Sequence, residues 1–353
     1  MYFHEKQGLA LNNPLENVVH SILLYNTIHT PPYCMLRIEL FMKDRAMNVK
    51  KRILTITAVL FLIILVAILG AGYYFSGLVV KPGVWEYDKT LASELEYGRF
   101  TREYYDSLPG EDLYIDSPNG YRLHAVYVPR GTNKTVIFVH GHTYTLLGDY
   151  KYLEIFRSRG YNALMFDSRY HGKSGGDNVT FGRYEKHDLE ACVDWVKKKQ
   201  GEDGIIGVHG ESMGSAICLL HAAEFDSTDF YIVDGPMADL GQLLAYRMKK
   251  DFGLPGFPLL QAASLASRVR GAMWFGDISP IEHINQADAP IFFIHGGEDS
   301  EIPVEHSKRL YSRYNGKKKI WICPGAGHSK SIIVNRKEYE KQVHAFLKDI
   351  GAL

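Results

Sequence analysis

Hydrophobic and polar positions divide the chain into an apolar stretch near its N-terminus and a longer region of alternating short strands and helices. Between positions 53 and 71 the only polar residues are two threonines, and no residue is charged. A helix rises 1.5 Å per residue, so this stretch is long enough to cross a hydrocarbon core of about 30 Å. We predict a transmembrane helix over about 53–75, in which Tyr73, Tyr74 and Phe75 form an aromatic belt at the membrane interface.

Basic residues gather on the N-terminal side of this stretch: Lys43, Arg45, Lys50, Lys51 and Arg52. The other side offers only Lys81 before acidic residues appear. Because basic flanks stay in the cytoplasm, we expect a single-pass protein of the cell membrane, with a cytoplasmic N-terminus and an extracytoplasmic main domain. Two other interpretations stay open: a secretory signal that is cleaved near Leu69-Gly70-Ala71, and a buried core helix.

The pattern predicts four segments. Residues 1–46 have no clear period and form a poorly defined extension, and we hypothesise that translation begins at Met47 instead. Residues 47–80 form a signal anchor, and the polar segment 81–111 forms a stalk or a first helix. Residues 112–353 form the main domain.

The main domain reads as an α/β fold. A Pro118-Asn119-Gly120 turn between two strands predicts an opening antiparallel hairpin. Strands are expected at 113–116, 121–128, 135–140, 162–166, 205–209, 230–233, 291–295 and 319–323, and helices at 150–158, 185–199, 215–225, 304–314 and 337–348. Short apolar strands that alternate with helices predict a mostly parallel sheet of about eight strands, flanked by helices on both faces.

One segment interrupts this alternation. Residues 236–288 are rich in leucine and aromatic residues and are broken by Pro255 and Pro258. The segment is longer than a crossover needs, so we expect a helical lid over a pocket. The alternative is an ordinary crossover helix with loops.

Composition narrows the function. Lys plus Arg number 40 and Asp plus Glu number 40, so no charge excess favours a nucleic-acid partner. The four cysteines lack metal-ligand spacing, and His140 and His142 have no neighbouring carboxylate or cysteine to complete a zinc set. We therefore expect no metal and no organic cofactor.

The strongest chemical signal is Gly210-Glu211-Ser212-Met213-Gly214, which lies between a predicted strand and a predicted helix. A G-x-S-x-G in that setting predicts a sharp turn that exposes the serine hydroxyl at the top of a sheet. Gly210 and Gly214 permit the turn. Serine becomes a nucleophile only when a base removes its proton, so Ser212 requires a histidine.

His328 and Asp299 are the expected partners of Ser212. His328 follows the last predicted strand in a glycine-rich loop, Pro324-Gly-Ala-Gly-His328, while the histidines at other strand ends are read as residues that order turns. A carboxylate must fix the histidine tautomer, and Asp299 follows the preceding strand. Glu298 and Glu301 are rivals of Asp299 for this role.

These motifs, in the order Ser212, Asp299, His328, resemble the α/β-hydrolase superfamily over roughly 112–353. Within it, the chain resembles the membrane-anchored bacterial serine esterases of the serine-aminopeptidase-like or acyl-thioesterase-like branch. The resemblance implies an oxyanion hole formed by the backbone N–H groups of His142 (with Thr143 as the alternative) and Met213.

The resemblance implies a serine hydrolase that cleaves carboxylic ester, thioester or small amide bonds through an acyl-enzyme. The apolar lid segment points to a small substrate with an apolar acyl part. Two alternatives remain: an extracytoplasmic serine peptidase or aminopeptidase, and a non-catalytic, membrane-anchored binding domain.

Overall fold

The computed structural model describes residues 32–353, so positions 1–31 of the predicted N-terminal extension lie outside the described residues. Contacts divide the chain into two units, one ending at Val66 and the other comprising Ala67–Leu353. Helix α2 (Pro32–Val80) begins ahead of Met47, inside the segment for which the sequence pattern gave no element. Proline is favoured in the first turn of a helix, because its missing N–H has no helical partner there.

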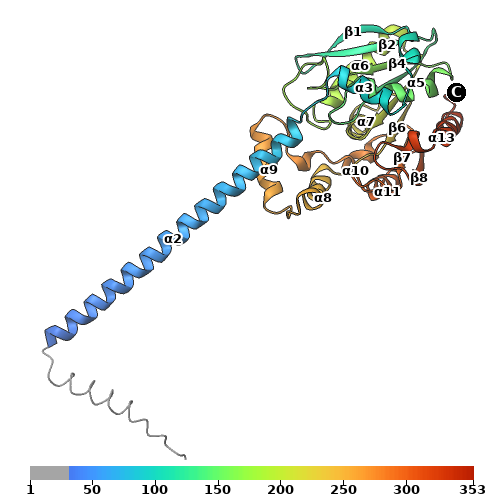
Figure 1. Cartoon of the computed structure of the whole chain (residues 1–353). Helices are drawn as coiled ribbons and strands as arrows, with labels where there is room; N and C mark the ends of the chain where they lie inside the picture. The colour runs from blue at the N-terminus through green and yellow to red at the C-terminus, as the bar shows by residue number, and fades with distance from the viewer. Residues whose placement is uncertain (1–31) are drawn as a thin grey trace, which may run out of the picture. The chain divides into compact units, whose positions relative to one another are not determined.

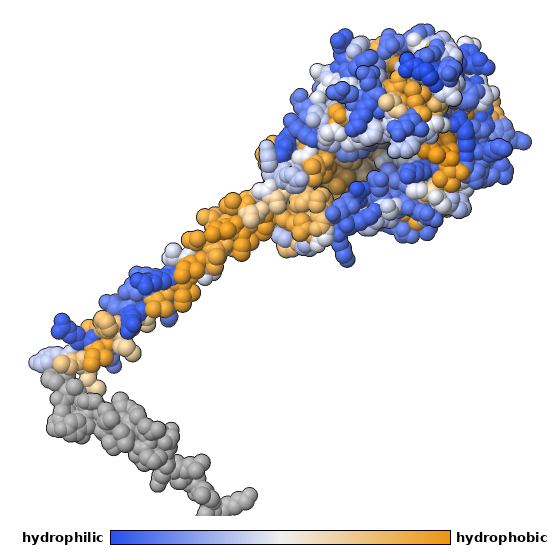
Figure 2. Space-filling view, viewed as in Figure 1, coloured by the Kyte–Doolittle hydropathy of each residue, from blue (hydrophilic) through white to orange (hydrophobic). Residues whose placement is uncertain are grey.

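Among the helices of residues 32–353, α2 alone is long and apolar enough to cross a membrane. No residue of its most apolar window is buried within the protein. Figure 2 shows hydrophobic residues along this helix, while hydrophilic residues cover much of the visible face of the globular unit. In water such exposed side chains are unfavourable, so they require an apolar partner.

The globular unit is built on one eight-stranded sheet with the order β1-β2-β4-β3-β5-β6-β7-β8. β1 pairs with β2, and β2 with β4, in antiparallel fashion, and the remaining neighbours are parallel. The strands are β1 (Glu111–Asp116), β2 (Arg122–Val128), β3 (Lys134–Val139), β4 (Asn162–Phe166), β5 (Ile205–Glu211), β6 (Phe230–Asp234), β7 (Ile291–Gly296) and β8 (Lys318–Cys323). The predicted α/β-hydrolase fold with a mostly parallel sheet is confirmed.

Helices lie on both sides of this sheet (Figure 1). They are α3 (Tyr87–Glu96), α4 (Arg102–Ser107), α5 (Tyr150–Arg157), α6 (Glu185–Gln200), α7 (Met213–Glu224), α8 (Leu240–Phe252), α9 (Leu259–Val269), α10 (Pro280–His283), α11 (Glu305–Arg313), α12 (Ser331–Val334) and α13 (Arg336–Asp349). Single 3₁₀ turns occupy η1 (Leu146–Asp149), η2 (Phe275–Asp277) and η3 (Ile284–Gln286). The predicted lid segment thus contains α8, α9, α10 and the short turns η2 and η3.

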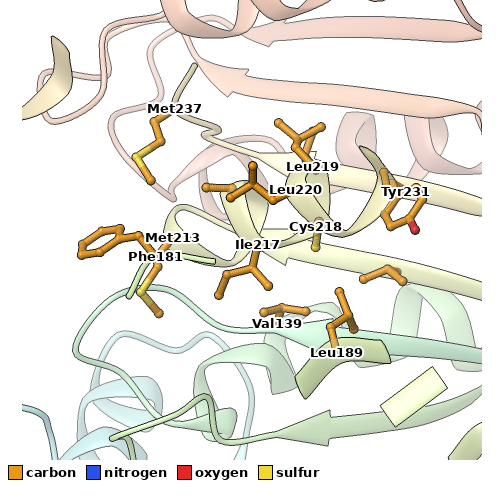
Figure 3. Packing of buried hydrophobic residues seen from close by; sticks show 14 of the residues in the cluster. Val139, Phe181, Leu189, Met213, Ile217, Cys218, Leu219, Leu220, Tyr231 and Met237 are labelled. Carbon is orange, nitrogen blue, oxygen red and sulfur yellow. The ribbon is translucent and has the colours of Figure 1, made fainter. Parts of the chain in front are cut away.

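Strand periodicity creates two hydrophobic cores, one on each face of the sheet. Successive side chains of a strand point to opposite faces, and in β3 Val136 and Phe138 belong to one cluster while Ile137 and Val139 belong to the other. The Val139 cluster packs α6 and α7 on the sheet, and the Phe138 cluster packs α5 and α13. Figure 3 shows side chains of α7, including Ile217, among those of the neighbouring elements.

Candidate active site

Ser212 stands on a strained turn between β5 and α7. Its φ of 56° and ψ of −114° lie where non-glycine residues are uncommon. The close approaches around it require glycines: a Cβ on Gly214 would lie 1.9 Å from the carbonyl oxygen of Val139, and a Cβ on Gly210 would lie 2.6 Å from Gly214. The turn that the sequence motif predicts is therefore present, with Ser212 at its apex.

His328 lies within hydrogen-bond distance of both Ser212 and Asp299, as the sequence motifs predict. His328 Nε2 lies 2.8 Å from Ser212 Oγ, and His328 Nδ1 lies 2.7 Å from Asp299 Oδ2. The three side chains come together because they follow β5, β7 and β8, which are parallel and end at the same edge of the sheet. A carboxylate only accepts, so Nδ1 carries the proton and Nε2 accepts from the serine hydroxyl.

Asp299 is held as an anion. Its Oδ1 accepts the backbone N–H groups of Glu301 and Ile302 at 2.8 and 2.9 Å. His295 Nε2 lies 3.2 Å from its Oδ2. Burial works to raise the pKa of Asp299, but hydrogen bonds from His295 and His328 prevail and hold this pKa well below its usual range. His295, which the sequence predicted to order a turn, therefore contacts Asp299.

The environment of His328 favours its protonated form. Burial lowers the pKa of His328, but the hydrogen bond and the charge of Asp299 outweigh burial, and this pKa lies above its usual value. Nearby, burial lowers the pKa of His142 to about 4, so that imidazole is neutral at pH 7. The site therefore contains one histidine that readily takes a proton and one that does not.

The predicted oxyanion donors lie beside the serine. His142, Met213 and Ser212 line one cavity. Met213 is the first residue of α7, where backbone N–H groups have no helical acceptor. Within residues 32–353 the N–H of His142 donates no hydrogen bond, whereas the N–H of Thr143 donates to His171 Nε2 at 3.2 Å. Of the two candidates in this loop, His142 is therefore the one whose N–H is available.

Comparisons with known proteins place this architecture in a family. The model of the alpha/beta hydrolase fold matches residues 134–254. The uncharacterized protein YqkD of Bacillus subtilis is 35% identical over 288 residues, which cover 81% of this chain and 94% of that protein. The esterase Pf2001 of Pyrococcus furiosus is 30% identical, with a TM-score of 0.60 over 71% of this chain and 95% of that one.

The chain belongs to the α/β-hydrolase family. The superfamily predicted from its motifs is thereby confirmed. A more distant relative is the lysophosphatidylserine lipase ABHD12 of Danio rerio, 23% identical over 197 residues that cover 52% of this chain and 47% of that protein. The chain thus spans about half the length of that lipase.

The cavity of this hydrolase measures about 330 Å³, within the usual range for ligand pockets. Ser212 and His328 line it together with apolar side chains from two helices of the predicted lid segment 236–288 and from the end of α2. α8 contributes Leu243 and Leu244, and α9 contributes Leu260. Ser212 and His328 therefore face a largely hydrocarbon surface.

A buried ionic cluster near the serine turn was not foreseen. Lys151 Nζ lies 2.6 Å from Glu211 Oε2, and the lysine side chain is 3% exposed. Burial lowers the pKa of Lys151, but the charges of Glu211 and Glu94 prevail and raise it, so the lysine is protonated. Lys151 lies in a predicted helix, and a lysine side chain on a helix is usually exposed to solvent. The sequence carries no local signal for this contact, because the partner carboxylate is distant along the chain.

Proposed function

We propose that the chain is a serine hydrolase that cleaves carboxylic esters, and by the same chemistry thioesters or small amides, through an acyl-enzyme. Ser212 is the nucleophile, His328 the general base and acid, and Asp299 the residue that orients His328. The observation that carries the proposal is the continuous chain of hydrogen bonds from Ser212 Oγ through the imidazole to Asp299. Such a chain lets the hydroxyl lose its proton as it attacks.

The reaction has two halves. In the first, Ser212 attacks the substrate carbonyl, His328 Nε2 takes the hydroxyl proton, and the N–H groups of His142 and Met213 donate to the developing oxyanion. Each such donor contributes about 3–4 kcal/mol to transition-state stabilisation. The imidazolium then protonates the leaving alcohol, and Asp299 stabilises its charge. In the second half, His328 takes a proton from a water molecule, which attacks the acyl-enzyme. The imidazolium then returns a proton to Ser212, and the carboxylic acid leaves.

The apolar cavity favours an ester with an uncharged acyl group over a peptide, because a peptide requires polar partners along its backbone. The likeness to an esterase of 30% identity favours the same substrate class. A panel of chromogenic esters and aminoacyl amides separates the esterase from the peptidase. Turnover of neither substrate class would favour the non-catalytic binding domain.

α2 serves in this proposal as the membrane anchor. Its apolar side chains are unburied, and basic residues precede them, so the N-terminus is cytoplasmic and the hydrolase unit extracytoplasmic. Protease added to intact cells is expected to digest the hydrolase unit. If the unit is digested only after lysis, the proposed orientation is wrong.

The catalytic assignment is tested with Ser212→Ala. Loss of the nucleophile is expected to lower kcat for a chromogenic ester by about 10⁶-fold, while the melting temperature stays near that of the wild type. Ser312→Ala, on the exposed surface of α11, is the matched control and is expected to keep full activity. Full activity of Ser212→Ala would refute the assignment.

A further inference from the structure

The last turns of α2 pack against the predicted lid segment 236–288. A Cβ on Gly72 would lie 2.6 Å from Ala262 of α9, so the two helices approach as closely as a glycine permits. The guanidinium of Arg270 lies 3.8 Å from the centre of the Tyr73 ring and donates to the Tyr73 carbonyl oxygen at 3.1 Å. Within the globular unit, this end of α2 is therefore a packed element.

The same turns form part of the wall of the active-site cavity. Phe75, Leu78 and Val79 line the cavity that Ser212 and His328 also line. The Phe75 ring meets the Phe252 ring of α8 edge to face, with centroids 5.0 Å apart. These side chains carry no polar group, so the part of a substrate that they contact is hydrocarbon.

The charged side chains of the cavity pair with one another. Arg247 Nε lies 2.6 Å from Asp251 Oδ2, and Arg247 Nη1 lies 3.4 Å from Glu301 Oε2. All three residues are partly exposed, so they form a polar rim next to the apolar wall. An uncharged chain fits this interior better than a charged group does, because the charged side chains already have partners.

Backbone contacts fix this wall relative to the reacting groups. The carbonyl oxygen of Val80 accepts the N–H of Val179, and Trp85 donates its N–H to the carbonyl oxygen of Thr143, each at 2.8 Å. Thr143 follows His142, the proposed oxyanion donor. The distance from the reacting carbonyl to the wall is therefore set by the fold, as a chain-length limit requires.

We propose that the C-terminal turns of α2, through Phe75 and Leu78, determine the length of the acyl chain that this hydrolase accepts, and that its substrates are esters of medium-length hydrocarbon acids. The proposal rests on the serine hydrolase function proposed above. A cavity of about 330 Å³ lies at the small end of the range of ligand pockets, which suits a hydrocarbon chain of limited length.

The test uses the full-length protein in detergent and p-nitrophenyl esters from acetate to dodecanoate. In the wild type, kcat/KM is expected to rise by about fourfold per methylene until the cavity is full, and then to level or fall. Leu78→Trp narrows the cavity and is expected to lower the octanoate-to-acetate ratio of kcat/KM about 16-fold, which corresponds to the exclusion of about two methylenes at about fourfold each. Phe75→Ala widens the cavity and is expected to move the optimum to longer chains.

Leu69→Ala is the matched control, because Leu69 is an exposed apolar residue of the same helix that does not line the cavity. It is expected to keep the wild-type profile. Opposite shifts in Leu78→Trp and Phe75→Ala support the proposal, and two variants give the answer even when one of them fails to fold. An unchanged optimum in both variants, or a wild type that prefers acetate, overturns the chain-length proposal alone, provided that acetate hydrolysis still depends on Ser212. No hydrolysis of any ester overturns the proposed function as well.

Discussion

Replacement of Asp299 by asparagine distinguishes an orienting carboxylate from a merely nearby charge. In the wild type, Oδ1 accepts two backbone N–H groups at 2.8 and 2.9 Å, while Oδ2 faces His328 Nδ1 at 2.7 Å and His295 Nε2 at 3.2 Å. An asparagine keeps its single oxygen on the backbone pair, since turning the amide would leave two buried N–H donors unsatisfied at about 1–3 kcal/mol each. Its NH₂ group therefore faces His328.

This orientation forces the wrong tautomer on His328. The amide donates to Nδ1, so the imidazole proton moves to Nε2, which then cannot accept the proton of Ser212. In serine hydrolases this change lowers kcat by about 10⁴-fold, which corresponds to about 5.4 kcal/mol of transition-state stabilisation. Asp299 also raises the pKa of His328, so the acid limb of the residual activity of Asp299→Asn is expected to move to lower pH.

The assay is the pH dependence of kcat/KM for a chromogenic ester, measured for the wild type, Asp299→Asn and Glu298→Gln. Glu298→Gln makes the same chemical change at the exposed neighbouring residue and is expected to keep the wild-type profile. The assignment of Asp299 would be refuted if Asp299→Asn lowered kcat/KM less than tenfold, or if Glu298→Gln lowered kcat/KM more than Asp299→Asn does.

Three further predictions concern the site and its support. In the wild type, kcat/KM is expected to fall as the pH drops through the pKa of His328, because only the neutral imidazole accepts a proton. That pKa lies above the usual value for histidine. A fall in kcat/KM that begins only below pH 6 would therefore contradict the role of His328. Lys151→Met leaves the buried carboxylate of Glu211 without its cation and is expected to lower the free energy of unfolding by about 3–5 kcal/mol in urea titrations, whereas a change under about 1 kcal/mol would contradict the ion-pair argument. Gly214→Ala places a Cβ 1.9 Å from the carbonyl oxygen of Val139 and is expected to abolish ester turnover. Gly276→Ala is the control, because the space around Gly276 is open, and is expected to keep turnover. An active Gly214→Ala enzyme would contradict the close approach of Gly214 to Val139.

The sequence predicted the fold because its signals are local. Most strands of the sheet are short apolar runs, and the motif around Ser212 is five consecutive residues, although Gly214 is required by the close approach of Val139 from another strand. The order Ser212, Asp299, His328 then follows from the C-terminal ends of β5, β7 and β8. Their catalytic roles stay predictions, although the side chains lie within hydrogen-bond distance.

The remaining features depend on contacts between distant segments. Phe75 reads as part of an aromatic belt, and only the packing of α2 against α8 and α9 brings it to the cavity. Lys151 reads as a solvated helix residue until Glu211 is placed beside it. His295 reads as a turn residue, and its contact with Asp299 depends on how the loop after β7 folds back.

Labelling with a fluorophosphonate, followed by peptide mapping, tests most directly whether Ser212 is an activated nucleophile. We expect one adduct on the peptide that contains Ser212, formed by the wild type and lost in both Ser212→Ala and His328→Ala. An adduct on another serine, or an unlabelled Ser212 in a preparation that hydrolyses esters, would refute the assignment of Ser212 as the nucleophile.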